Sequence, residues 1–126
     1  MKKVMVFGTF DVLHKGHLDL FNQARKFGDY LIVVVARDKN VLKIKGKLPR
    51  NNEKKRLDAI KNYADKWVLG FLKDRYKVIR EFKPNIICLG YDQEANIKEL
   101  KLLKIRLIRL KAHMPHKYKS SKLQIT

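Results

Sequence analysis

Two histidines, His14 and His17, are the residues of this sequence best placed for chemistry on a phosphate group. They flank Lys15-Gly16 where an apolar strand gives way to a helical pattern. A helix N-terminus offers unpaired amide groups and the positive end of the helix dipole, and both favour an anion. Residues three apart at such a position can direct their ring N–H groups into the same space. We also expect Gly16, which lacks a side chain, to let a phosphate approach the backbone closely.

A structural interpretation of the same residues is also open. His17 could be a packed helix residue and His14 a solvated loop residue, which is the more common outcome for an isolated His-x-Gly-His segment. The context favours function, because the apolar run Val4–Phe7 precedes the segment and Gly8–Asp11, with the sequence Gly-Thr-Phe-Asp, leads into it.

The elements that must position these histidines alternate between strands and helices. Short apolar runs predict five strands, at Val4–Phe7, Leu31–Ala36, Trp67–Gly70, Ile86–Gly90 and Ile105–Leu110. Apolar residues at helical spacing predict helices from Gly16 to Gly28, from Asn51 or Asn52 to Ala64, from Asp74 to Phe82 and from Glu94 to Leu103. Arg37–Arg50 is expected to be a polar connection with a turn of helix near Val41, and a last helical turn is expected after Ser120.

This alternation predicts the α/β class, as one Rossmann-like domain over residues 1–126 with a five-stranded parallel sheet and helices on both faces. Such sheets bind ligands beyond the carboxyl ends of their strands, where the strand order reverses. The site is therefore expected in the segments that follow strands, at Gly8–His17, Arg37–Lys47, Gly70–Asp74 and Gly90–Asp92. The sequence contains neither GxGxxG nor a Walker motif, which excludes the usual dinucleotide and P-loop sites.

Composition narrows the class of partner. The 126 residues contain 30 Lys and Arg against 12 Asp and Glu, a net charge of +18, so an anionic ligand is expected. The one cysteine, Cys88, excludes a disulfide framework, and its apolar surroundings predict a buried thiol. Because no signal-peptide core and no membrane-spanning apolar run are present, we expect a soluble cytoplasmic domain without a membrane partner. The charge leaves open whether the anion is a nucleic acid or a small phosphate compound.

Gly8–Asp11 followed by His14–His17 resembles the GTFDxxHxGH signature of the cytidylyltransferase-like nucleotidyltransferases. Four further segments resemble that family's second strand, lysine loop, arginine-bearing helix start and post-strand motif, at Leu31–Asp38, Lys43–Pro49, Glu53–Arg56 and Gly90–Gln93. Within the family the chain looks most like archaeal-type FAD synthases, which transfer AMP from ATP to FMN. Glycerol-3-phosphate cytidylyltransferases are similar in the HxGH turn and usually differ after Gly90.

The resemblance implies a set of site residues and partners. His14 and His17 would bind the triphosphate and stabilise the transition state, and Lys45, with Lys43 and Lys47 as rivals, would reach the β- and γ-phosphates. The nucleotide-binding residues implied besides the histidines are Gly8, Thr9, Phe10, Arg56, Asp92, Ser120 and Ser121. Mg²⁺ is expected with the triphosphate, and Asp11 is the nearest carboxylate. The resemblance also implies a homodimer.

Several of these residues have structural alternatives. Asp11 could cap its own turn, and Arg56 could pair with Asp58 or Glu53 on its helix. Trp67 is expected to pack in the core or at the sheet edge.

Residues 113–126 are expected to form a C-terminal active-site element that departs from the family pattern. Lys119 stands in the first serine place, Met114 stands roughly where the cytidylyltransferases carry an arginine, and the cysteines of archaeal FAD synthases are missing here. His113 and His116 have only weak metal-ligand spacing, and one distant cysteine does not complete a zinc site.

The implied reaction joins an acceptor phosphate oxygen to the α-phosphorus of a nucleoside triphosphate and expels pyrophosphate. A phosphate monoester has its second pKa near ~6, so this nucleophile is largely ionised at neutral pH and needs no general base. What remains is to align anions and to stabilise developing charge, which positioned donors and cations can do.

Two alternatives stay open. One is cytidylyl transfer from CTP to glycerol 3-phosphate or a similar phosphoalcohol. The other is a non-catalytic nucleotide or nucleic-acid-binding module, suggested by the net charge of +18. A nucleic-acid module predicts exposed aromatics among basic residues, whereas Phe7, Phe21, Phe27 and Trp67 lie on core-like faces or strands. We therefore expect nucleic-acid binding only in a weak, non-specific form.

Overall fold

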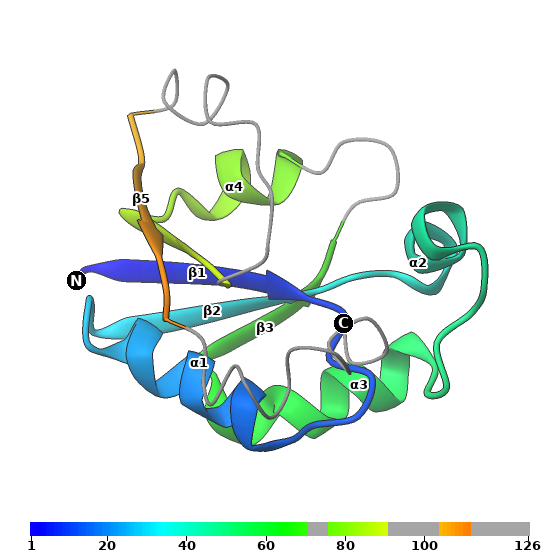
Figure 1. Ribbon diagram of the computed structural model, residues 1–126. Coiled ribbons are helices and arrows are strands. Elements are labelled where there is room, and N and C mark those ends of the chain that lie inside the picture. The colour runs from blue at the N-terminus through cyan, green and yellow to red at the C-terminus, as the bar shows by residue number, and fades with distance from the viewer. Residues whose placement is uncertain (71–75, 91–103, 112–126) are drawn as a thin grey trace.

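The computed structural model describes residues 1–70, 76–90 and 104–111. These residues form a sheet of five parallel strands in the order β3-β2-β1-β4-β5 (Figure 1). The strands are β1 Lys3–Gly8, β2 Tyr30–Val35, β3 Lys66–Leu69, β4 Ile86–Leu89 and β5 Arg106–Arg109. The order reverses between β1 and β4, so the carboxyl end of β1 is where a ligand site is expected.

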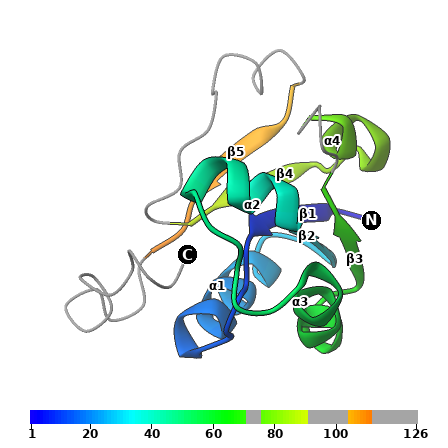
Figure 2. The ribbon, with the colours of Figure 1, turned by 90° about the vertical axis from the view of Figure 1, so that its right-hand side faces the viewer.

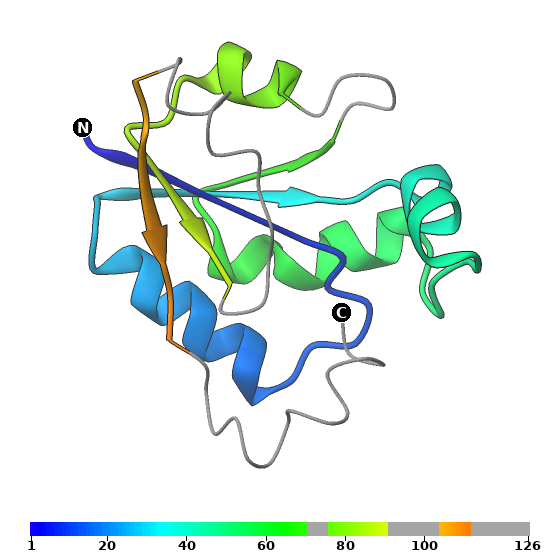
Figure 3. The same cartoon turned by 45° about the horizontal axis from the view of Figure 1, so that its top comes forward.

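Helices cover both faces of the sheet, as the sequence pattern predicts. Helices α1 (Lys15–Arg25) and α3 (Glu53–Ile60) lie against one face, and α4 (Lys77–Phe82) lies against the other (Figure 1 and Figure 3). A 3₁₀ turn, η1 (Lys61–Tyr63), continues from α3. The α/β class, the parallel sheet and the helices on both faces are confirmed.

Alternate residues of the strands supply two buried apolar clusters, one on each face of the sheet. Val4 and Val6 of β1 pack in the cluster that includes Phe21 of α1, and Met5 packs in the cluster that includes Val78 of α4. A strand covered on both faces has to be apolar at every position, which explains the continuous run in β1. This burial determines where β1 ends and where the following turn begins.

Helix α2 (Asp38–Lys45) corrects the prediction for residues 37–50. The sequence predicts a polar connection with one helical turn, whereas the structure has an eight-residue helix that ends at Gly46 with a φ of 80°. The helix lies beyond the ends of the strands (Figure 1 and Figure 2), and Val41 is its buried residue. A helix with one buried side chain has no apolar stripe, so the periodicity that predicts the other helices is missing.

Three further predictions concern Cys88, Trp67 and the end of helix α3. Cys88 is 0% exposed, as expected, and burial raises the pKa of its thiol to about 11. Trp67 lies on the edge strand β3 and is 40% exposed, so it is an edge residue and not part of the core. Helix α3 ends at Ile60, and Ala64 therefore falls outside the helix.

The helix predicted over residues 94–103 and the turn predicted after Ser120 lie outside the described residues. Within the described ranges, no helix combines the length and the apolar character needed to cross a membrane.

Candidate active site

The turn between β1 and α1 is held by the two histidines themselves. His14 is the N-cap of α1, with an extended backbone (φ −143°), and its Nδ1 accepts a hydrogen bond from Gly16 N at 3.0 Å. In return, His17 Nδ1 accepts a hydrogen bond from His14 N at 3.3 Å. The ring centroids lie 3.9 Å apart. Two imidazoles thus form the reciprocal cap that a serine and a glutamate form in other helices.

These hydrogen bonds determine where the imidazole protons lie. A ring nitrogen that accepts a hydrogen bond carries no proton, so each neutral ring has its proton on Nε2. His17 is 8% exposed, and burial together with the neighbouring His14 lowers the pKa of His17 from 6.5 to about 4. At neutral pH His17 is therefore an uncharged Nε2–H donor fixed in the first turn of α1. The arrangement suits a phosphate oxygen through hydrogen bonding and not through imidazolium charge.

Gly16 allows a close contact within the turn, and the phosphate approach predicted for it stays a prediction. A Cβ at this position would stand 2.7 Å from Cε1 and 2.9 Å from Nδ1 of His14. The His14 ring folds back over the glycine and occupies the place that a side chain would take. Gly16 is therefore needed so that His14 can cap the helix.

Gly8 and Phe10 show the same kind of close approach one step earlier. A Cβ at Gly8 would stand 2.5 Å from the Phe10 ring, and Phe10 itself has a positive φ of 52°. The Phe10 ring is buried and packs 5.4 Å from the His17 ring and 5.3 Å from the Phe21 ring, between centroids. Phe10 thus supports His17 from the core, and contact of Gly8, Thr9 and Phe10 with a nucleotide stays a prediction.

Asp11 ties this turn to the loop between α2 and α3. Its carboxylate oxygens accept hydrogen bonds from Arg50 N and Asn51 N, both at 2.7 Å. Because both oxygens already serve backbone amides, the carboxylate is poorly suited to the metal role implied for it. Across the described residues there is no group of three or more His, Cys, Asp or Glu side chains that could hold a metal ion. The side chains in the described part of the chain thus do not fit a metal site built by those residues alone.

Lys45 is the exposed last residue of α2, and its ammonium interacts electrostatically with Asp11. Partial desolvation lowers the pKa of the ammonium, Asp11 raises it in part, and Arg56 and Lys47 lower it. The fold thus brings a lysine from the second strand-to-helix connection toward the histidine turn. Its rivals Lys43 and Lys47 are also exposed, and the assignment among the three stays a prediction.

Arg56 occupies a position that neither sequence-based interpretation describes. Its side chain is fully buried, and its guanidinium pairs with Asp38 at 2.6 Å instead of with Asp58 or Glu53. Asp58 pairs with Lys61 at 2.7 Å. Direct contact of Arg56 with a nucleotide stays a prediction, and the buried position argues against it.

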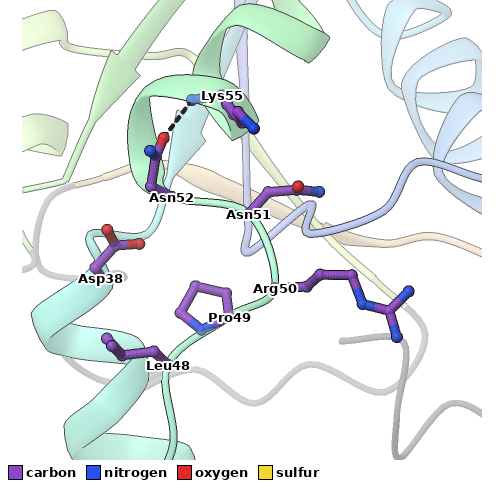
Figure 4. Close-up of a pocket in the computed structure, with 7 residues that line it drawn as sticks. All are labelled: Asp38, Leu48, Pro49, Arg50, Asn51, Asn52 and Lys55. Atoms are coloured by element: carbon purple, nitrogen blue, oxygen red, sulfur yellow. Dashed lines mark hydrogen bonds between the residues drawn. The ribbon is translucent and has the colours of Figure 1, made fainter.

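A cavity of about 210 Å³ lies between α2 and the first turn of α3 (Figure 4). Its lining, most of it polar, consists of Asp38, Leu48, Pro49, Arg50, Asn51, Asn52 and Lys55. Asn52 caps α3 by accepting a hydrogen bond from Lys55 N at 2.9 Å, which confirms one of the two caps predicted. Asn51 instead donates to the carbonyl of Asp11. The sequence does not predict the contacts of Asn51 with Asp11 and of Asp38 with Arg56. Only the positions of Asn51 and Asp38 after predicted elements could have indicated such a role.

The other residues implied by the resemblance, Asp92, Ser120 and Ser121, lie outside the described residues, as does the element predicted over 113–126. The geometry described here is that of the HxGH turn and of the two helices that follow β2.

Comparison with known proteins identifies the family. The model of the cytidylyltransferase-like family matches residues 5–123. The chain belongs to that family. Among the relatives of this cytidylyltransferase-like chain, a FAD synthase from Aciduliprofundum boonei is 40% identical over 121 residues, which cover 90% of this chain and 80% of that protein. A FAD synthase from Archaeoglobus profundus is 42% identical over 128 residues, covering 96% and 82%.

A solved structure of similar fold is described as the lipopolysaccharide core biosynthesis protein from Thermoplasma volcanium. It has a TM-score of 0.82 and 37% sequence identity to this cytidylyltransferase-like chain, and it covers 90% of this chain and 98% of its own. The family that the GTFDxxHxGH segment resembles is thus confirmed by a match that extends over residues 5–123.

Proposed function

We propose that this cytidylyltransferase-like protein transfers AMP from Mg·ATP to FMN, giving FAD and pyrophosphate. The observation that carries the reaction class is the reciprocal cap of His14 and His17, which fixes two imidazoles side by side at the start of α1. The substrate pair is supported by two FAD synthases that are 40% and 42% identical to this chain. Their matches cover 90% and 96% of it.

The chemistry is an in-line displacement at phosphorus. A phosphate oxygen of FMN forms a bond to the α-phosphorus of ATP, the bond from that phosphorus to the bridging oxygen breaks, and pyrophosphate leaves with the electron pair. The acceptor phosphate is largely ionised already, since its second pKa is near ~6. The protein's task is to hold the anions in line and to stabilise charge on the oxygens.

The two histidines act as hydrogen-bond donors in this scheme. Their Nε2–H groups stabilise the oxygens around the reacting phosphorus, and their fixed positions avoid the cost of reorganising a solvent shell. The low pKa of His17, about 4, keeps its ring uncharged around neutral pH, with the Nε2–H group as its donor. Lys45 supplies positive charge to the β- and γ-phosphates.

Mg²⁺ arrives as part of the ATP substrate, held by the triphosphate oxygens, as this ion commonly binds. We propose that Asp92, Ser120 and Ser121 complete the nucleotide site. We also propose that the protein works in the cytoplasm and that it is a homodimer. Light scattering of the purified protein tests the oligomeric state directly.

The test offers the purified protein Mg²⁺ with either ATP and FMN or CTP and glycerol 3-phosphate. We expect pyrophosphate and FAD in the first reaction. An enzymatic assay measures the pyrophosphate, and chromatography measures the FAD. Pyrophosphate only from CTP and glycerol 3-phosphate would overturn the acceptor assignment. Release in neither mixture would contradict transfer between these substrate pairs and favour a nucleotide-binding module or another acceptor.

A further inference from the structure

Arg56 is a buried cation to which the proposed chemistry assigns no step. The residue is 1% exposed, so its charge neither contributes to solubility nor attracts ligands from solution. Burying a guanidinium is costly unless its donors are hydrogen-bonded and its charge is paired. The identity of its partners therefore indicates what it does.

Each guanidinium nitrogen donates to a different segment of the chain. Nε donates to Asn51 O at 3.0 Å, Nη1 to Thr9 O at 2.8 Å and Nη2 to Asp38 Oδ1 at 2.6 Å. These acceptors lie in the loop before α3, in the turn after β1 and at the first residue of α2. Because the fork is planar and rigid, it sets the distances among the three segments.

Further hydrogen bonds extend this connection. The Asp38 carboxylate also accepts from Glu53 N at 3.2 Å, and the Glu53 carboxylate accepts from Asp38 N at 2.9 Å. The first residues of α2 and α3 are thus joined reciprocally. Asp11, through Arg50 N and Asn51 N, joins the histidine turn to the same loop.

The connection reaches both proposed phosphate-binding groups. On one side, the carbonyl that Arg56 holds belongs to Thr9, whose successor Phe10 packs against His17 at 5.4 Å between ring centroids. On the other side, Asp38 begins the helix that carries Lys45 at its end. One guanidinium therefore links the histidine donors after β1 to the lysine after β2.

We infer that Arg56 is a positioning residue that sets the histidine turn and the lysine-bearing helix α2 in register, without itself contacting the nucleotide. The inference rests on the proposed nucleotidyl transfer. A lysine cannot substitute, because one ammonium on a flexible stem does not reproduce three donors in a fixed plane.

The test compares Arg56→Lys with a matched control, Arg25→Lys. Arg25 also donates to a backbone carbonyl and a carboxylate, Tyr63 O at 2.7 Å and Asp65 Oδ2 at 3.1 Å, but at the other end of α1. Since a misplacement of about 1 Å can cost about 10²-fold in rate, we expect Arg56→Lys to lower kcat for FAD formation by about 10- to 100-fold. KM for ATP should change less than kcat, and both constants of the control variant should stay close to wild type. A raised KM with unchanged kcat would make Arg56 a nucleotide ligand and overturn the inference.

A second measurement needs no turnover. NMR titration of the substrate-free protein follows His17, whose pKa of about 4 reflects burial beneath Phe10 and beside His14. Loosening the turn admits water and should raise this pKa toward 6.5 in Arg56→Lys and not in Arg25→Lys. A folded Arg56→Lys protein with the wild-type His17 titration would overturn the inference.

If Arg56→Lys does not fold, Asp38→Asn serves instead, because it keeps an acceptor for Nη2 and removes the charge. A smaller fall in kcat and a smaller shift of the His17 pKa are expected, and no change in either overturns the inference. If the wild-type protein makes no FAD, the proposed function fails, while the His17 titration still decides whether Arg56 positions the turn.

Discussion

Two segments follow neighbouring strands at the same end of the sheet, and they present their chemistry in opposite ways. After β1, the two histidines cap the helix reciprocally with their ring centroids 3.9 Å apart, and His17 packs on the buried Phe10. After β2, the lysines of α2 extend from a helix whose Ile44 is 80% exposed. The first segment offers donors in fixed positions, among them the uncharged His17 ring, and the second offers charge on long side chains. We expect the first to govern the rate of the chemical step and the second to govern binding.

The largest effect should come from removing a fixed donor. His17→Ala should lower kcat by about 10²–10³, the usual cost of losing one positioned donor to developing charge. Single-turnover formation of FAD measures this, with His17→Gln as the control that keeps an N–H donor and should lose less. Wild-type rates in both His17→Ala and His14→Ala would break the comparison.

Gly16→Ala should act almost as strongly without touching a donor atom. The added methyl group would meet the His14 ring at 2.7 Å and displace it from its cap, so we expect kcat to fall by about 10²-fold. Gly70→Ala is the matched control, because its nearest neighbour would lie at 3.8 Å, an ordinary contact. Equal rates in the two variants would show that the position of the His14 ring is not limiting.

Acid should lower the free energy of unfolding of the protein through His17, in the first segment. The pKa of His17 is about 4 in the folded protein against 6.5 unfolded, so below pH 6.5 protons bind preferentially to the unfolded chain. Stability should fall as the pH drops from 7 toward 4, by about 2 kcal/mol at pH 5. Urea unfolding at pH 7 and pH 5 measures this loss, and His17→Gln should lack that part of it. The same pH dependence in both proteins would contradict a neutral, buried His17.

The smallest effect should come from the exposed segment. Lys45→Ala should raise KM for ATP by about tenfold, the order expected for one charged hydrogen bond, and should change kcat less. Lys26→Ala, which removes an exposed lysine at the end of α1, is the control and should bind ATP normally. A larger effect of Lys43→Ala or Lys47→Ala would transfer the role to that lysine.

The sequence predicts the sheet well because strands buried on both faces have to be continuously apolar. It also predicts the histidine turn, since His14 and His17 are close in sequence and the cap they form is local. Helix α2 is missed because Val41 is its buried residue, which leaves no periodic signal.

Two contacts, at Gly16 and Arg56, were not predicted for another reason. At Gly16 the contact depends on the orientation of the His14 ring, which local spacing does not reveal. For Arg56 the sequence offers the neighbours Asp58 and Glu53, whereas the true partner, Asp38, is 18 positions away on another helix. A partner that the fold brings from another element leaves no mark in local spacing.

The buried thiol of Cys88 has a practical consequence. It is the one cysteine of the chain, it is 0% exposed in β4, and its pKa is raised to about 11. Because only the thiolate reacts with alkylating reagents, the native protein should resist labelling until the sheet opens. The rate of Cys88 alkylation, measured by mass spectrometry, therefore reports how often the core opens, and no mutation is needed. Adding ATP should lower this rate if nucleotide binding stabilises the folded domain.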